Sequence, residues 1–168
     1  KKLTFDFYSR PDVLQIAKEL LGKILVSAID GKVCTGRIVE TEGYIGITDK
    51  ASHSFGGKRT ARNEHMYGVA GISYVYICYG MHHLFNVVTN DENIPDAVLI
   101  RAVEPIAGIE QMLARTGKKT VDFTLTKGPG NVAKAFGITK GHSGVNLLKN
   151  EIYLADDGFV ISENEIGS

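Results

Sequence analysis

The 168-residue sequence has no tryptophan, only two cysteines and only four prolines, and its 19 basic residues are matched by 19 acidic ones. The isolated Cys34 and Cys78 give no disulfide framework, which favours buried free thiols in an intracellular protein. No apolar run reaches membrane-spanning length and no basic-plus-apolar leader opens the chain, so we expect no membrane association. A net charge of zero does not favour nucleic-acid binding, because nucleic-acid-binding domains are often strongly basic.

The charges that are present are unevenly distributed. Basic residues gather within 58–62 and 115–119, whereas acidic residues gather within 89–96 and 155–165. A basic face on a neutral protein is therefore possible. With 43% hydrophobic and 23% charged residues, the composition is that of an ordinary soluble domain with a sizeable core.

Hydrophobic periodicity and turn residues predict one α+β domain. Helices are expected at 9–23, from Pro105 through 116, and after the Gly-Pro turn of 127–137. Asp30-Gly31 predicts a β-hairpin over 23–44, and a long polar loop follows at 46–71. Further strands are expected at 71–80, 82–90, 96–105, 152–157 and 159–164. Neighbouring strands with few helical crossovers predict a curved, mainly antiparallel, open-barrel-like sheet with flanking helices.

The segment RIVETEGYIG, residues 37–46, places two carboxylates and a tyrosine in a predicted strand, although strands disfavour Glu. Because side chains alternate across a strand, Ile38, Glu40, Glu42 and Tyr44 should share one face. An edge strand kept soluble by charge would explain this pattern. A carboxylate beside an aromatic residue before a glycine-rich loop also indicates the wall of a pocket.

Three of the seven tyrosines lie within residues 74–79. Alternation puts Tyr74, Tyr76 and Cys78 on one face and Tyr79 on the other, and Tyr79 precedes Gly80, so it should protrude from a turn. Core aromatics and a stacking pocket for a planar ligand both remain open interpretations.

Two polar residues interrupt apolar strands. Arg101 lies within VLIRAV and Asn86 within LFNVV, and buried polar groups require partners. A structural ion pair is one interpretation of Arg101. The alternative is that Arg101 orients Glu40, Glu42 or a water molecule in a site built on a rigid sheet.

The five histidines do not predict a metal site. His82 and His83 are adjacent and should point to opposite faces of a strand, and the others have no ligand-like spacing. The segment KGPGN lacks the Gly-Lys-Ser/Thr ending of a phosphate-binding loop, although its amides at a helix start could hold one phosphate.

Five segments taken together resemble the alkyladenine (3-methyladenine) DNA glycosylase family, of the mammalian type that also occurs in bacteria. They are GRIVETEGYIG, ASHSFGGKRTARNEHMY, YVYICYGMHHLFNVV, AVLIRAVEP and KGPGNVAKAFG. The resemblance implies a bacterial member that is a monomeric DNA glycosylase domain over residues 1–168, without metal or organic cofactor. It also implies a cytoplasmic location, or a nuclear one in a eukaryote.

The implied activity is base-excision repair. The enzyme would flip a damaged purine out of double-stranded DNA and hydrolyse its N-glycosidic bond; 3-methyladenine, 7-methylguanine, hypoxanthine and ethenoadenine are candidate bases. By motif, Glu42 corresponds to the general base that activates water, and Arg101 to the group that holds that water with it. Tyr44, His53 and Tyr76 correspond to the base-stacking pocket.

Further positions correspond to DNA contacts. Tyr79 matches the wedge that fills the gap left in the duplex, and Asn86 matches a steric gate against purines with a 2-amino group. Residues near the DNA backbone are matched by Lys58, Thr60, Lys127 and Gly130.

The chain departs from the family pattern in two places. Asn131 stands where family members often have Lys, so one DNA-backbone contact is not expected here. Family members usually continue beyond the position of Ser168 with a segment that closes the site, which the printed chain does not include.

Two alternatives to a DNA glycosylase follow from the same residues. An O-glycoside hydrolase could use Glu40 and Glu42 as its carboxylate pair, but both would approach the sugar from one side. A non-catalytic damaged-DNA-binding module would use the basic loop and the tyrosines without needing Glu42.

Overall fold

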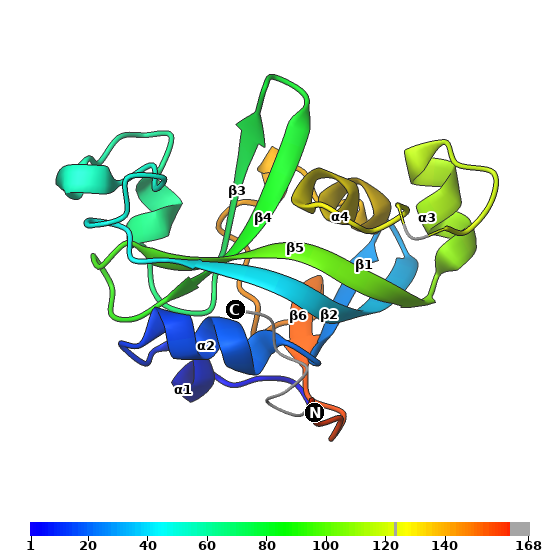
Figure 1. The fold of residues 1–168 in the computed structure, drawn as a ribbon, viewed down its shortest axis with the longest axis horizontal. Coiled ribbons are helices and arrows are strands. Elements are labelled where there is room, and N and C mark those ends of the chain that lie inside the picture. Colours follow the sequence, from blue (N-terminus) through cyan, green and yellow to red (C-terminus); the bar gives the residue numbers. More distant parts are fainter. Residues whose placement is uncertain (123, 162–168) are drawn as a thin grey trace.

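One curled antiparallel sheet organises the chain in the computed structural model, which describes residues 1–122 and 124–161 (Figure 1). Within these residues the strands are β1 (Ile24–Ile29), β2 (Lys32–Tyr44), β3 (Ser73–Cys78), β4 (His82–Thr89), β5 (Asp96–Ala107) and β6 (Ile152–Ala155). They are ordered β3-β4-β5-β2-β1-β6, and all paired neighbours are antiparallel. The predicted α+β class with a curved antiparallel sheet is confirmed.

Helices flank the sheet, with α1 and α2 near one face and α3 and α4 on the other (Figure 1). The helices are α1 (Phe5–Tyr8), α2 (Val13–Leu20), α3 (Ile109–Thr116) and α4 (Pro129–Phe136). The loop between β2 and β3 contains two short 3-10 turns, Phe55–Gly57 and Glu64–Tyr67, and a third turn spans Lys140–His142. The predicted hairpin over 23–44 is confirmed as β1 and β2, joined at Asp30 and Gly31.

The first long helix is shorter than the predicted span of 9–23. Asp12 is its N-cap, because the Asp12 side chain accepts a hydrogen bond from the Gln15 backbone N–H, and Pro11 lies outside the helix. The helix then runs from Val13 to Leu20 with one apolar face buried.

The prediction that Pro105 opens a helix is wrong, because β5 continues through this residue. Pro105 lies opposite Gly36 beside a register irregularity at which β5 carries one extra residue, Ile106, and a strand tolerates the missing N–H at such a place. The turn follows at Gly108, with a φ of +78°, where a Cβ atom would lie 2.3 Å from the Val33 carbonyl oxygen. The helix α3 therefore begins at Ile109.

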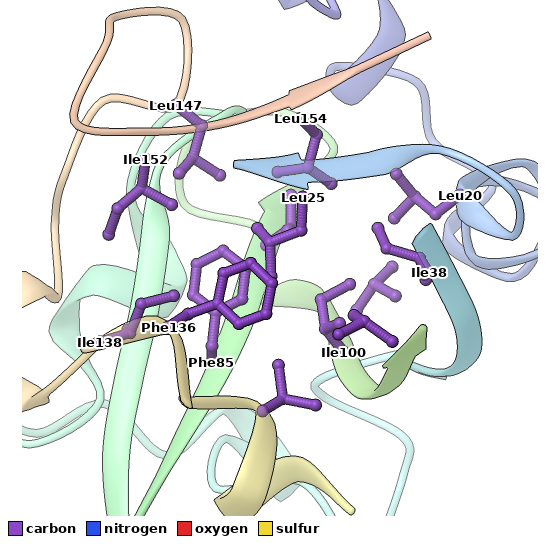
Figure 2. Packing of buried hydrophobic residues seen from close by; sticks show 14 of the residues in the cluster. Leu20, Leu25, Ile38, Phe85, Ile100, Phe136, Ile138, Leu147, Ile152 and Leu154 are labelled. Atoms are coloured by element: carbon purple, nitrogen blue, oxygen red, sulfur yellow. The ribbon is translucent and has the colours of Figure 1, made fainter. Parts of the chain in front are cut away.

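The main hydrophobic core lies inside the curl of the sheet. Figure 2 shows Leu25, Phe85, Phe136, Ile152 and Leu154 converging from β1, β4, α4 and β6. The predicted strand at 159–164 is not found over 159–161, and its remaining residues lie outside the described part of the chain.

A change of register in β2 decides which side chains face away from the core. Pairing with β5 is irregular between Ile38 and Glu40 and again between Glu40 and Thr41, as in a β-bulge. Ile38 is fully buried in the core, whereas Glu40 and Glu42 are exposed. The prediction that Ile38 shares a face with Glu40, Glu42 and Tyr44 is therefore wrong, because the extra residue restarts the alternation at Glu40.

Candidate active site

A charged cluster lies where β2 and β5 lose their regular pairing. Arg101 donates through Nε to Glu40 Oε1 at 3.0 Å and through Nη1 to Glu42 Oε1 at 3.1 Å. The exposed fractions of the three side chains are 37% for Arg101, 50% for Glu40 and 46% for Glu42. The sequence named Glu40 and Glu42 as alternative partners of Arg101, and in the structure Arg101 forms ion pairs with both.

Glu42 holds a second hydrogen bond. The Tyr44 hydroxyl donates to Glu42 Oε1 at 2.7 Å. Burial, followed by the hydrogen bond and charge of Glu42, raises the pKa of Tyr44, so this hydroxyl stays protonated at neutral pH. Both hydrogen bonds that the described residues donate to the Glu42 carboxylate end on Oε1, so Oε2 retains its lone pairs for another donor.

An aromatic pocket adjoins the charged cluster through Tyr44. Tyr74 and Tyr76 share one face of β3, as predicted, with ring centroids 5.5 Å apart. His53, from the loop between β2 and β3, lies 2.8 Å from the Tyr74 hydroxyl through Nδ1 and packs edge-on against Tyr76 at 4.2 Å between centroids. The pocket is lined by Tyr44, Ala51, Ser52, His53, Met66, Tyr74, Tyr76 and Asn86.

This pocket is narrow. The free space between its side chains is about 10 Å³, which is room for about one water molecule. A base stacked between His53 and Tyr76 would need the two rings separated by two stacking distances, and here they touch. Entry of a base between them would therefore require His53 and its loop to move away from β3.

His53 is electrostatically suited to remain neutral. Burial lowers the pKa of His53 below its ordinary value, and the positive charges of Arg62 and Lys58 lower it further. Both effects disfavour the protonated ring, so His53 presents an uncharged face at neutral pH.

Asn86 forms part of the pocket wall and is buried. Its amide Nδ2 donates to the backbone carbonyls of Tyr74 at 3.3 Å and Leu84 at 3.4 Å. The expectation that a buried Asn in this strand finds partners is confirmed.

The hairpin of β3 and β4 projects from the sheet, and Tyr79 lies at its tip (Figure 1). Tyr79 has a φ of +53° and is 92% exposed. Its predicted protrusion from a turn is confirmed. The exposed Met81 beside it was not identified from the sequence, because a single methionine in a turn carries no distinctive pattern.

The four residues predicted near the DNA backbone lie in two groups. Asn63 fixes the first group: its Oδ1 accepts from Thr60 N at 2.7 Å, and its Nδ2 donates to the Lys58 carbonyl at 2.9 Å. In the second group, the backbone of Lys127 forms an isolated antiparallel β-bridge with Ala102, the residue after Arg101 in β5. Gly130 lies in α4.

Sequence reasoning missed four pocket residues: Ala51, Ser52, Met66 and Tyr74. Tyr74 could have been included from its alternation with Tyr76. A larger cavity of about 490 Å³ lies between β4, α4 and the turn joining β1 to β2, and of the predicted site residues only Gly130 lines it. The residues predicted to stack on a base therefore line the smaller pocket, and Glu42 and Arg101 lie in the charged cluster beside it.

Asn131, the departure from the family pattern, has a local structural role. Its amide Nδ2 donates to the carbonyls of Thr124 at 3.1 Å and Lys127 at 2.9 Å.

Within residues 1–122 and 124–161, no three His, Cys, Asp or Glu side chains cluster as metal ligands would. None of the helices in this part of the chain is long and apolar enough to cross a membrane.

Comparison with known proteins first defines the class: the chain is similar to DNA glycosylases, hydrolases of DNA base-excision repair. The family model described as Methylpurine-DNA glycosylase (MPG) matches residues 6–167, and the chain belongs to this family.

Two curated relatives carry the name "Putative 3-methyladenine DNA glycosylase". The one from Desulfitobacterium hafniense is 50% identical over 164 residues, covering 94% of this chain and 80% of the relative. The one from Clostridium perfringens strain 13 is 45% identical over 167 residues, covering 95% of this chain and 81% of the relative.

Proposed function

We propose that the protein flips an alkylated or deaminated purine out of duplex DNA and hydrolyses its N-glycosidic bond with a water molecule activated by Glu42. The name of the relatives makes 3-methyladenine the first candidate base; 7-methylguanine, hypoxanthine and ethenoadenine complete the proposed range. One observation carries the proposal: the Glu42 carboxylate is held on one oxygen by Tyr44 and Arg101 at the edge of an aromatic pocket.

The proposed chemistry needs one carboxylate. Glu42 Oε2 takes a proton from water while the water oxygen bonds to C1′ of the sugar. The bond between C1′ and the base nitrogen breaks, and its electron pair leaves with the base. The negative charge of Glu42 stabilises the oxocarbenium-like sugar in the transition state. A methylated purine that carries a positive charge leaves as a neutral base without a separate acid, whereas hypoxanthine or ethenoadenine leaves as an anion that then takes a proton from solvent.

Recognition is assigned to the aromatic pocket. Tyr44, His53 and Tyr76 would stack on the flipped base, and electron-rich rings favour a cationic base. A neutral His53 avoids repelling that cation. Asn86, in the pocket wall, would obstruct purines that carry a 2-amino group.

Contacts to the duplex are assigned to the hairpin tip, to the loop between β2 and β3, and to the segment that leads into α4. Tyr79 would fill the space left by the flipped nucleotide, with the protein acting as a monomer. Extrusion costs a few kcal/mol, and less at a damaged pair, which contributes selectivity. The proposed phosphate contacts are Lys58, Thr60, Lys127 and Gly130.

The test is single-turnover base release from duplex DNA containing one hypoxanthine, with chelator present, for the unmodified protein and Glu42→Gln. General-base catalysis contributes about 10²–10⁴-fold, so release should fall by that factor in the variant. Lesion binding should persist. Glu110→Gln, an exposed change in α3, is the matched control.

Two outcomes would contradict the proposal. Release by both proteins would remove Glu42 from its assigned role. Release by neither, with tight lesion binding, would instead favour a damaged-DNA-binding module.

A further inference from the structure

One guanidinium is shared by two carboxylates in the charged cluster. Arg101 gives its Nε–H to Glu40 and an Nη1–H to Glu42, and the two bonds differ by only 0.1 Å, 3.0 against 3.1 Å. Glu40 has no assigned role in the reaction proposed above, yet its bond to Arg101 is as short as that of Glu42.

The sharing limits what Arg101 can do to Glu42. An Arg facing a single carboxylate commonly binds both oxygens with its planar fork. Here the guanidinium is divided between two carboxylates: Glu40 accepts from Nε–H, and Glu42 accepts one bond, from Nη1–H to Oε1. The oxygen Oε2 of Glu42, which would receive the proton of water, is left without a donor among the described residues.

The sharing also sets the local charge. Two carboxylates and one guanidinium sum to a net charge of −1 where an oxocarbenium-like sugar would form. If Glu40 were neutral, the pair of Arg101 and Glu42 would sum to zero. An uncompensated carboxylate is the better base and the better partner for a cation.

We propose that Glu40 is a positioning residue of this site: it draws the Arg101 guanidinium to one side, so that Glu42 keeps a free oxygen and an uncompensated negative charge. This inference rests on the proposed function of Glu42. Glu40 and Glu42 share a face because they are two residues apart in β2, and Arg101 is the extra residue of β5 at the register shift between Glu40 and Thr41.

The charged and titratable neighbours of both carboxylates are few. Glu42 is faced by Arg101 from β5, by Glu40 and Tyr44 from its own strand, and by Tyr76 from β3. Glu40 also lines a shallow pocket of about 290 Å³, whose other charged residues are Glu104, Asp122 and Lys127.

The test is the pH dependence of single-turnover release for Glu40→Gln and Glu40→Asp. In Glu40→Gln the charge of Arg101 acts on Glu42 alone, which favours the ionised carboxylate. The acid limb of the profile should therefore move to lower pH, and the plateau rate should fall about tenfold because the base is weaker. Affinity for lesion DNA should not decrease, because a negative charge has been removed near the phosphates.

Glu40→Asp keeps the charge, so its acid limb should stay in place, and Glu110→Gln should change neither limb nor plateau. A uniform loss of rate in Glu40→Gln with an unmoved limb would reduce Glu40 to a structural ion pair and overturn the inference, as would an unchanged rate. If Glu42→Gln still releases base, the proposed function itself fails. If Glu42→Gln is inactive and Glu40→Gln behaves like the unmodified protein, only the inference fails.

Discussion

The two halves of the site are built in opposite ways. Glu42 and Arg101 belong to two paired strands and are partly exposed, with hydrogen bonds already formed. His53, Tyr74 and Tyr76 are packed against one another, and the pocket that they line with other residues has almost no free space. The half assigned to chemistry thus has its hydrogen bonds in place, whereas in the half assigned to base recognition a base could stack between His53 and Tyr76 only if these two rings separated.

Opening the aromatic half has an energetic consequence. Separating His53 from Tyr76 breaks an edge-to-face contact and strains the hydrogen bond to the Tyr74 hydroxyl. A flipped base must offset this cost with its own stacking, so a base that stacks weakly would fail to hold the pocket open. The contact between His53 and Tyr76 would in this way select for bases that stack strongly.

The largest expected effect comes from breaking the charged half. In Arg101→Met, two carboxylates remain side by side without a cation, so Glu42 loses both its orientation and its stability as an anion. We expect single-turnover release to fall about 10²-fold, the cost typical of removing one pre-organised electrostatic group. Lesion binding should change much less than the rate of release.

Thermal unfolding distinguishes this from a folding defect. Partly exposed ion pairs contribute at most about 1 kcal/mol to stability, so the free energy of unfolding of Arg101→Met should differ from that of the unmodified protein by no more than this amount. A loss of lesion affinity as large as the loss of rate would show that Arg101 takes part in base recognition. The proposed division between a charged half for chemistry and an aromatic half for recognition would then be wrong.

A substitution in the aromatic half should reduce lesion affinity more than the rate of base release. Tyr76→Leu removes one stacking face, and base–aromatic stacking is worth about 1–3 kcal/mol per base, so lesion affinity should fall about tenfold or more. Release from the saturated complex should change less, because the charged half is intact. Titration of lesion duplex measures the first quantity, and single-turnover release at saturating protein measures the second.

Tyr153→Leu, in the remote strand β6, is the matched control for Tyr76→Leu and should alter neither quantity. A fall in the saturated rate with unchanged affinity would place Tyr76 in the chemical step instead.

Sequence reasoning succeeded where the backbone is locally regular. The alternation of Tyr74 and Tyr76 held because β3 pairs with β4 without interruption. The same rule failed at Ile38 because the bulges of β2 depend on its long-range pairing with β5, which residue types alone do not indicate. The prediction at Pro105 failed for a related reason: an extra residue of β5 beside Pro105, which only the pairing with β2 reveals, lets a proline remain inside the strand.

The candidate site was named from family motifs, and the contacts came only from the structure. That Arg101 needed an acidic partner was foreseeable from its apolar strand. That it holds Glu40 and Glu42 together was not, because this depends on where the register changes. The packing of His53 against Tyr76 was equally hidden, since His53 lies in an irregular loop whose path no periodicity predicts.

The smallest expected effect lies in the electrostatics of His53. Arg62→Gln removes one of the two positive charges that lower the pKa of His53, so this pKa should rise. It should stay below its ordinary value, because burial, the largest cause, remains. Nuclear magnetic resonance titration of the His53 ring measures the shift directly, and Arg59→Gln is the matched control because Arg59 pairs with Glu64.

A higher pKa has a functional consequence with a definite sign. As pH falls, His53 becomes protonated earlier in Arg62→Gln, and a cationic ring repels a cationic methylpurine. Affinity for such a base should therefore drop about twofold in acid, whereas affinity for hypoxanthine, which is neutral, should not follow the same trend. An equal rise in the pKa of His53 in Arg59→Gln would mean that the charge of the whole loop, rather than Arg62, keeps the recognition half neutral.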